Sequence, residues 1–242
     1  CALSVAGGAA HAQSALGFGP YIQILSEDSV AVCAWLDREV PAYIQLESQG
    51  RAPGSHELKG FQPGCATVSG LSTHESYAFR LFIDGEEIGD RQHPPVFVIT
   101  PAAKQTIAII GDTRSGDNSF DLEHRQIVQT IFNEIYPDAV IHTGDFVERD
   151  ELQLWRGFFL LEREMLASTP IYPTVGRSDQ PAEIMHRLFP ALPEKSYYSF
   201  DRGAAHFAVL NLWRTSSQPD SEVGEDGEQA RWLRKDLAEA RN

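Results

Sequence analysis

The chain has 242 residues, of which 42% are hydrophobic and 22% charged, a composition typical of a globular protein that excludes a disordered chain. It carries 20 Lys and Arg against 34 Asp and Glu, a formal net charge of −14. This charge excludes a nucleic-acid-binding surface as its main feature, because neutralising phosphates needs clustered Lys and Arg. No stretch reaches the roughly 20 apolar residues that span a bilayer. The length fits one large domain or two modest ones.

The first residues have the composition of a leader. Residues 1–18 are rich in Ala and Gly, and the Ala-His-Ala sequence at 10–12 matches a signal-peptide cleavage pattern. We therefore expect residues 1–18 to be the remnant of a signal peptide, with a lipoprotein that starts at Cys1 and a plain Ala/Gly leader as alternatives. Both the signal peptide and the lipoprotein place the protein in the bacterial envelope, periplasmic or secreted.

Residues 19–101 consist of short alternating runs between turn residues, without a helix of useful length. Six runs rich in Val, Ile, Tyr and Phe predict strands: 21–25, 29–36, 42–47, 65–71, 77–83 and 95–100. Their spacing is typical of an all-β sandwich of the fibronectin III or immunoglobulin type. Leu71 followed by Tyr77 resembles the tyrosine corner of such domains, in which the phenol bonds back to the chain.

Two cysteines, Cys33 and Cys65, lie in these predicted strands. An oxidising compartment would permit a disulfide between them. However, Cys33 alternates in phase with Trp35, whereas Cys65 is out of phase with Val68. One sulfur is then expected inside the sandwich and one outside, which favours two thiols over a disulfide.

Residues 104–242 show a different pattern, in which apolar runs alternate with helical stretches. Strands are predicted at 106–110, 139–143 and 171–175, and helices at 120–136, 151–167, 182–189 and 229–241. Asp112 and Asp145, at the ends of the first two strands, are 33 positions apart, which is about the length of a βαβ unit. This part is therefore expected to be an α/β core with a parallel sheet covered by helices on both faces.

Gly-Asp pairs stand where two of the predicted strands end. Asp112 and Asp145 each follow a glycine at the carboxyl end of a strand, and Gly176 follows the third strand. Open α/β sheets bind ligands at this edge, and carboxylates there can hold a hard or borderline cation. The pattern predicts a metal site at Asp112 and Asp145, with two helix-capping aspartates as the alternative.

Three motifs in this order resemble those of the calcineurin-like metallophosphoesterase superfamily: GDTR at 111–114, HTGD at 142–145 and VGRSD at 175–179. A fibronectin-like domain ahead of such a core is similar to purple acid phosphatases. The resemblance implies a hydrolase with two divalent metal ions, Fe, Zn or Mn, that activate a hydroxide against phosphate mono- or diesters. It assigns Asp112 to the first metal and Asp145 to the bridge between both. Residues 104–242 would then be an incomplete phosphoesterase domain.

The chain departs from the superfamily pattern at three positions. Arg114 stands where many members have His, Arg177 where Asn would bind the second metal, and Ser178 where the catalytic His would stand. Arginine cannot serve as a metal ligand. One hypothesis is that the second metal is lost, leaving one ion or none, and that Asp145 or Asp179 pairs with Arg177. The competing hypothesis is that Arg177 clamps a phosphate with two hydrogen bonds.

Two histidines are candidates near the site. His124 shares a helical stripe with Val128 and Ile131, so that it can reach the site as a ligand or catalytic acid, or remain a buried structural histidine. His142 stands inside the second strand, where it can support Asp145 from behind or belong to the core.

The residues and motifs favour one main function and leave one alternative. The main expectation is a metal-dependent phosphoesterase of the bacterial envelope, acting on a phosphorylated small molecule or other phosphoester. The alternative is a non-catalytic protein of the same fold that binds a ligand or another protein. The chain stops at Asn242 inside a predicted helix, before the superfamily's later histidine motifs. We therefore expect a fragment without the C-terminal part of the core, itself inactive.

Overall fold

The structure is a computed structural model that describes residues 15–48, 54–99, 104–114, 121–213, 224 and 226–240. The cleavage pattern at 10–12 and most of the expected leader lie outside the described residues. None of the described helices is both long and apolar enough to cross a membrane.

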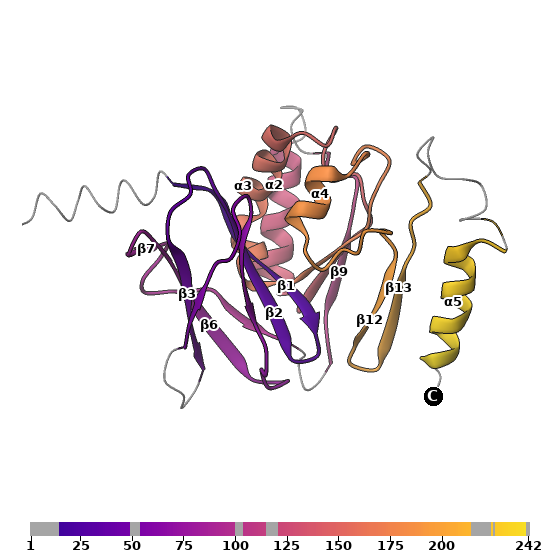
Figure 1. Cartoon of the computed structure of the whole chain (residues 1–242), viewed down its shortest axis with the longest axis horizontal. Helices are drawn as coiled ribbons and strands as arrows, with labels where there is room; N and C mark the ends of the chain where they lie inside the picture. The colour runs from indigo at the N-terminus through magenta and orange to yellow at the C-terminus, as the bar shows by residue number, and fades with distance from the viewer. Residues whose placement is uncertain are drawn as a thin grey trace, which may run out of the picture.

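Two antiparallel sheets face each other in the N-terminal half (Figure 1). The first has the order β1-β2-β5 and consists of β1 (Leu16–Ser26), β2 (Ser29–Leu36) and β5 (Gly64–Val68). The second has the order β4-β3-β6-β7, with β8 also paired to β6, and consists of β3 (Ala42–Ser48), β4 (Gly54–Glu57), β6 (Ser76–Ile83), β7 (Glu86–Ile88) and β8 (Val96–Val98). Side chains from both sheets, such as Val32 and Phe79, form one buried core, as the alternating pattern predicts.

The expected contact of Tyr77 is present. Its Oη accepts a hydrogen bond of 2.7 Å from the backbone N–H of Ser72 and donates one of 3.0 Å to Glu75. The phenol therefore ties the start of β6 to the preceding turn, as in a tyrosine corner.

The C-terminal half contains the predicted parallel sheet. Its order is β11-β10-β9, made of β9 (Ile107–Ile110), β10 (Ala139–His142) and β11 (Ile171–Pro173), and both pairings are parallel. Three helices accompany it, α2 (Asp121–Thr130), α3 (Leu152–Ser168) and α4 (Glu183–Leu188), and α2 runs on as one π-helical turn, η1 (Ile131–Ile135). The spacing of the Gly-Asp pairs thus predicted the βαβ units correctly.

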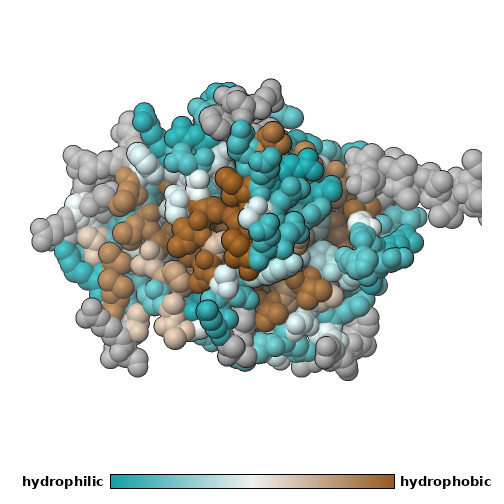
Figure 2. Space-filling view, turned by 180° about the vertical axis from the view of Figure 1, so that it is seen from behind, coloured by the Kyte–Doolittle hydropathy of each residue, from teal (hydrophilic) through white to brown (hydrophobic). Residues whose placement is uncertain are grey.

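We expected helices on both faces of this sheet, but on the face that carries Tyr172 the structure has a hairpin. There the ring of Tyr172 stacks at 3.7 Å on Phe200 of a hairpin, β12 (Tyr198–Arg202) with β13 (Ala205–Val209). The side chain of Ile109 on β9 remains 66% exposed. In the described chain, a hairpin rather than a helix therefore covers part of this face of the sheet. On the surface seen from behind, apolar residues gather near the middle of the molecule (Figure 2).

The two halves share a second apolar core. It joins Phe18 and Tyr21 of β1 to residues of α3 and α4. The ring of Phe159 stacks on Phe18 at 4.7 Å, and the Tyr21 hydroxyl donates a 2.6 Å hydrogen bond to the backbone carbonyl of Leu188. All eight residues of β2 are buried, because one face of its sheet lines the sandwich and the other meets the helices.

This double burial corrects the cysteine expectation. Cys33 and Cys65 are directly opposite each other on β2 and β5 and form a disulfide. Cys65 is indeed out of phase with Val68, which belongs to the sandwich core. The error concerned Cys33, which shares with Trp35 the outer face of the sheet, the face that packs against the helices. Both sulfurs therefore lie on the same side.

Helix α5 (Glu228–Glu239) lies beside β13, at the end of the molecule away from the sandwich (Figure 1). It corresponds to the helix predicted at 229–241. It contacts the hairpin through polar side chains, such as Asp236 with Ser199 and His206.

Candidate functional site

The two predicted aspartates lie in neighbouring turns at the carboxyl edge of the parallel sheet. The backbone N–H of Asp112 donates to the carbonyl of Gly144 at 3.0 Å, and that of Arg114 donates to the carbonyl of Asp145 at 3.0 Å. Asp112 and Asp145 have φ values of 57° and 55°, in the left-handed region that Asp tolerates better than most residues. The chain therefore turns sharply after each strand and brings the two carboxylates together.

The third turn packs against the second, backbone to backbone. A Cβ on Gly176 would lie 2.1 Å from the backbone nitrogen of Asp145, and one on Gly144 would lie 2.7 Å from the Cα of Gly176. No side chain fits at either contact. The glycines of the Gly-Asp and Val-Gly motifs therefore place the Asp145 turn and the turn after β11 in direct contact.

Arg114 lies across the two aspartates. Its Nε donates to Asp112 Oδ1 at 2.7 Å, and its Nη2 donates to Asp145 Oδ2 at 2.8 Å. Its Nη1 is also 3.9 Å from Glu148 Oε2. The hydrogen bond to Asp112, helped by the neighbouring negative charges, raises the pKa of Arg114. The hypothesis that Arg177 pairs with Asp145 or Asp179 is wrong, because Arg114 is the partner of Asp145.

Arg177 itself lies in the turn after β11. It is exposed, and its side chain makes no ion pair or hydrogen bond with the described part of the chain. The pairing was therefore predicted for the wrong arginine. Arg114 binds the two aspartates, and the guanidinium of Arg177 is not bound to the described residues.

Asp179 is buried and binds backbone rather than a cation. Its carboxylate accepts hydrogen bonds from the N–H groups of Asp145 at 2.8 Å, Phe146 at 2.9 Å and Gly176 at 2.8 Å, with Val147 at 3.4 Å. Burial raises the pKa of Asp179 to about 6, and these N–H donors oppose the shift. Asp179 therefore holds the Asp145 turn against the turn after β11.

Ser178 also holds this turn. Its backbone N–H donates to Asp145 Oδ1 at 2.9 Å, and its Oγ donates to the carbonyl of Val147 at 2.6 Å. Asp145 therefore has one carboxylate oxygen on Arg114 and the other on Ser178.

His142 lies directly behind the Asp145 turn. Its Nδ1 accepts the N–H of Gly144 at 3.2 Å, and its Nε2 is 3.0 Å from Thr113 Oγ1. The Thr113 hydroxyl donates its own hydrogen to the carbonyl of Phe146 at 3.0 Å, so Nε2 of His142 must carry a hydrogen. Burial lowers the pKa of His142 well below its ordinary value. A neutral His142 therefore links the turns after β9 and β10.

His124 lies in the core between α2 and α3. Its Nε2 is 2.7 Å from Oε1 of Glu162, and the two side chains are 4% and 0% exposed. Burial raises the pKa of Glu162. This arrangement corresponds to the buried structural histidine, the alternative to a ligand or acid at the site.

The carboxylates do not form a metal centre in the described part of the chain. No group of three or more His, Cys, Asp and Glu side chains is arranged there to hold a metal ion. Asp112 and Asp145 supply oxygen ligands, but a guanidinium occupies the space between them. Because a guanidinium cannot coordinate a cation and repels it, these residues as arranged do not fit a two-metal site.

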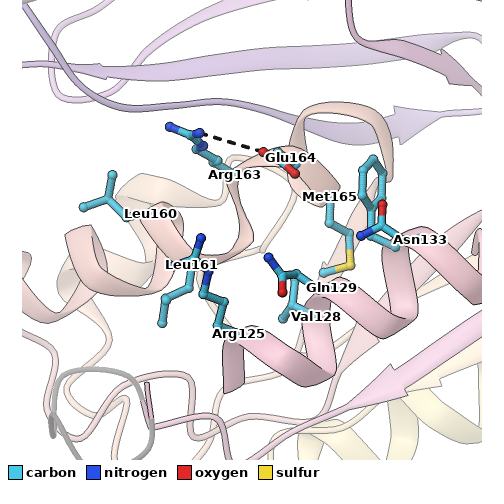
Figure 3. Close-up of a pocket in the computed structure, with 10 residues that line it drawn as sticks. Arg125, Val128, Gln129, Asn133, Leu160, Leu161, Arg163, Glu164 and Met165 are labelled. Carbon is cyan, nitrogen blue, oxygen red and sulfur yellow. Dashed lines mark ion pairs between the residues drawn. The ribbon is translucent and has the colours of Figure 1, made fainter. Parts of the chain in front are cut away.

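A groove between α2 and α3 is separate from this edge. Its volume is about 340 Å³, and it is lined by Val128 and Met165 with polar neighbours such as Arg125 (Figure 3). None of the predicted site residues lines it.

Comparisons with known proteins show similarity at the level of the fold. No protein-family profile matches the sequence, and no curated protein does. The structure is similar to that of purple acid phosphatase PPD1 from seeds of yellow lupin (Lupinus luteus), with a TM-score of 0.68 and 15% identity over 90% of this chain and 48% of that one. It is also similar to the structure of PhoD, with a TM-score of 0.61 and 14% identity over 94% of this chain and 60% of that one.

The two TM-scores show that the chain shares its fold with both proteins. The chain spans 48% and 60% of the length of the two proteins.

Proposed function

We propose that the chain binds phosphoesters at the carboxyl edge of the β11-β10-β9 sheet and that its described residues do not hydrolyse them with two metals. The position of Arg114 between Asp112 and Asp145 is the observation that carries this proposal. In the fold shared with the lupin phosphatase, these aspartates stand at the edge where α/β sheets bind ligands. A cation of the protein itself now lies there.

The remaining donors of the two arginines supply the binding chemistry. A guanidinium has five N–H donors in a planar fork that matches phosphate oxygens. Arg114 uses one donor on Asp112 and one on Asp145, which leaves the rest of its fork for a ligand. Arg177 lies in the turn that packs against the Asp145 turn and has its whole fork free of the described residues. A phosphorylated small molecule with a terminal phosphate is the class of ligand that suits this pair.

A titration with inorganic phosphate and phenyl phosphate at low ionic strength tests the proposal. Arg177→Ala is expected to weaken binding by about tenfold or more, because a hydrogen bond to a charged group contributes about 1.5–3 kcal/mol. Arg149→Ala is the matched control, since Arg149 follows β10 but donates to Glu151. Equal affinity of the wild type and both variants would contradict the proposal.

Metal-dependent hydrolysis of phosphate mono- or diesters is the second candidate. The placement of Asp112 and Asp145 after neighbouring parallel strands favours it, because carboxylate oxygens suit a cation such as Mn²⁺, one of the three expected ions. It requires Arg114 to leave the aspartates. Phosphate release from p-nitrophenyl phosphate that is stimulated by added Mn²⁺ and abolished in Asp145→Asn would establish it over binding alone.

We also propose the type of each domain and the compartment in which the protein is found. Residues 19–101 would be a fibronectin III-type domain, supported by the β1-β2-β5 and β4-β3-β6 sheets and by the Tyr77 contact. Residues 104–242 would belong to a calcineurin-like phosphoesterase domain. The disulfide between Cys33 and Cys65 supports a periplasmic or secreted protein, because disulfides persist in oxidising compartments.

A further inference from the structure

His206 lies between two carboxylates that come from different elements. Its Nδ1 is 2.7 Å from Oδ1 of Asp201 on β12, its partner across the hairpin. Its Nε2 is 2.8 Å from Oδ2 of Asp236 on α5. A neutral imidazole has one N–H and one lone pair, so it can donate to only one of these carboxylates. Both contacts at once require the doubly protonated imidazolium.

We propose that the imidazolium of His206 clamps helix α5 to the β12–β13 hairpin, and that loss of its proton loosens the helix. The proton leaves to solvent, and a ring nitrogen with a lone pair then faces a carboxylate oxygen. One of the two contacts must open, and in either tautomer the neutral ring attracts Asp236 on α5 less strongly than the imidazolium does.

The remaining attachment of α5 is weak enough for this contact to matter. Among the residues of the helix, only Gln229 is buried, where it exchanges two hydrogen bonds with the backbone of Asn211. The ring of Trp232 lies 4.9 Å from that of Tyr197. The helix is therefore held mostly by polar and single ring contacts rather than by a large apolar face.

The charged groups around His206 set the direction of the switch. Asp236 and Asp201 face its ring from α5 and β12, and Asp236 also accepts a hydrogen bond from Ser199 Oγ. The hydrogen bonds to Asp236 and Asp201 raise the pKa of His206 above its ordinary value.

Two further ion pairs involve this helix, Lys195 with Glu228 and Lys235 with Glu239, and Arg231 of the helix donates to the backbone carbonyl of Asp226. These groups keep their charge across the neutral range. The clamp is therefore fully present below the ordinary histidine pKa of about 6.5, and it is lost as the pH rises through the raised value.

Hydrogen exchange of the α5 amides between pH 5.5 and 9 tests the clamp, with each rate divided by that of an unstructured chain at the same pH. The corrected exchange of residues 228–239 is expected to rise with pH, by about tenfold for each unit by which the pKa of His206 is raised. In His206→Gln the exchange should be fast at all pH values. The matched control is His93→Gln, because His93 faces a single carboxylate, Asp90, on an exposed loop.

A proton NMR titration of the His206 ring keeps the test independent of folding defects in the variant. The ring is expected to titrate above 6.5, and Asp236→Asn should move its pKa back toward that value. A wild type whose α5 exchange does not depend on pH overturns the proposal. So does a pH dependence that persists in His206→Gln, or a His206 that titrates at or below 6.5.

Discussion

Removing the guanidinium at position 114 should convert the two aspartates into a cation site. In Arg114→Met an unbranched apolar side chain replaces the stem of the arginine, but Asp112 Oδ1 and Asp145 Oδ2 lose the donors that lie 2.7 and 2.8 Å from them. Both oxygens converge on one small planar group, so a divalent ion with oxygen ligands about 2.0–2.6 Å away fits between them. The variant is therefore expected to bind Mn²⁺ more tightly than the wild type.

The size of the effect follows from two costs that the wild type must meet. A cation must first displace Arg114, and its two partly exposed ion pairs contribute roughly 0.4–2 kcal/mol together. The displaced guanidinium then repels the ion: a unit charge about 5 Å from a divalent cation costs roughly 1.7 kcal/mol even at the dielectric constant of water. The sum of about 3 kcal/mol corresponds to an affinity gain of about 100-fold in Arg114→Met.

Calorimetric titration with Mn²⁺ measures this gain directly. Arg149→Met is the matched control, because Arg149 lies in the same turn region but binds Glu151 rather than the two aspartates. The reasoning is refuted if Arg114→Met and Arg149→Met bind Mn²⁺ with the same affinity. It is also refuted if the wild type already binds two equivalents tightly.

Two further predictions concern packing. Gly176→Ala should lower the free energy of unfolding, measured in urea, by more than about 2 kcal/mol, because the new Cβ would lie 2.1 Å from a backbone nitrogen. The control Gly157→Ala places its Cβ in open space on α3 and should be neutral or stabilise the protein by up to about 1 kcal/mol. Reducing the disulfide between Cys33 and Cys65, 32 positions apart, should cost about 3–4 kcal/mol, and an unchanged melting temperature in dithiothreitol would contradict this.

The sequence predicted those elements whose pattern is set by their own residues. The parallel strands are continuous apolar runs that end in glycine, so their positions and spacing were readable, and strand β2 was predicted with its observed bounds. Strands β4 and β7 were missed because their sequences, Gly54–Glu57 and Glu86–Ile88, are short and mostly polar. Their pairing depends on neighbours that are distant in sequence, which no local pattern reports.

Contacts between distant segments were the main source of error. Cys33 was correctly predicted to lie on the same face of its strand as Trp35. That this face is the outer one of the sandwich could not be predicted, because it is buried only by α3 packing against it. Likewise, the presence of two arginines near the aspartates was predicted, and which one pairs with Asp145 was not. Arg114 directly follows the turn after β9 and reaches back over both carboxylates, whereas Arg177 comes from the turn beyond. The sequence alone contains no information on that choice.

In the motif at 175–179, some residues hold the turn in place and one, Arg177, is free of the described residues. Asp179 and Ser178 bind backbone groups of the turn after β10, and Gly176 permits the close approach. The contacts of Asp179 and Gly176 use a carboxylate and a missing Cβ, so they do not depend on the side chain at position 177, whereas the bond to the Val147 carbonyl requires the hydroxyl of Ser178. The turn packed in this way carries an exposed cation, Arg177. Because an arginine attracts a phosphate and repels a metal ion, Arg177 at this edge agrees better with the proposed binding of a phosphoester than with hydrolysis by two metals.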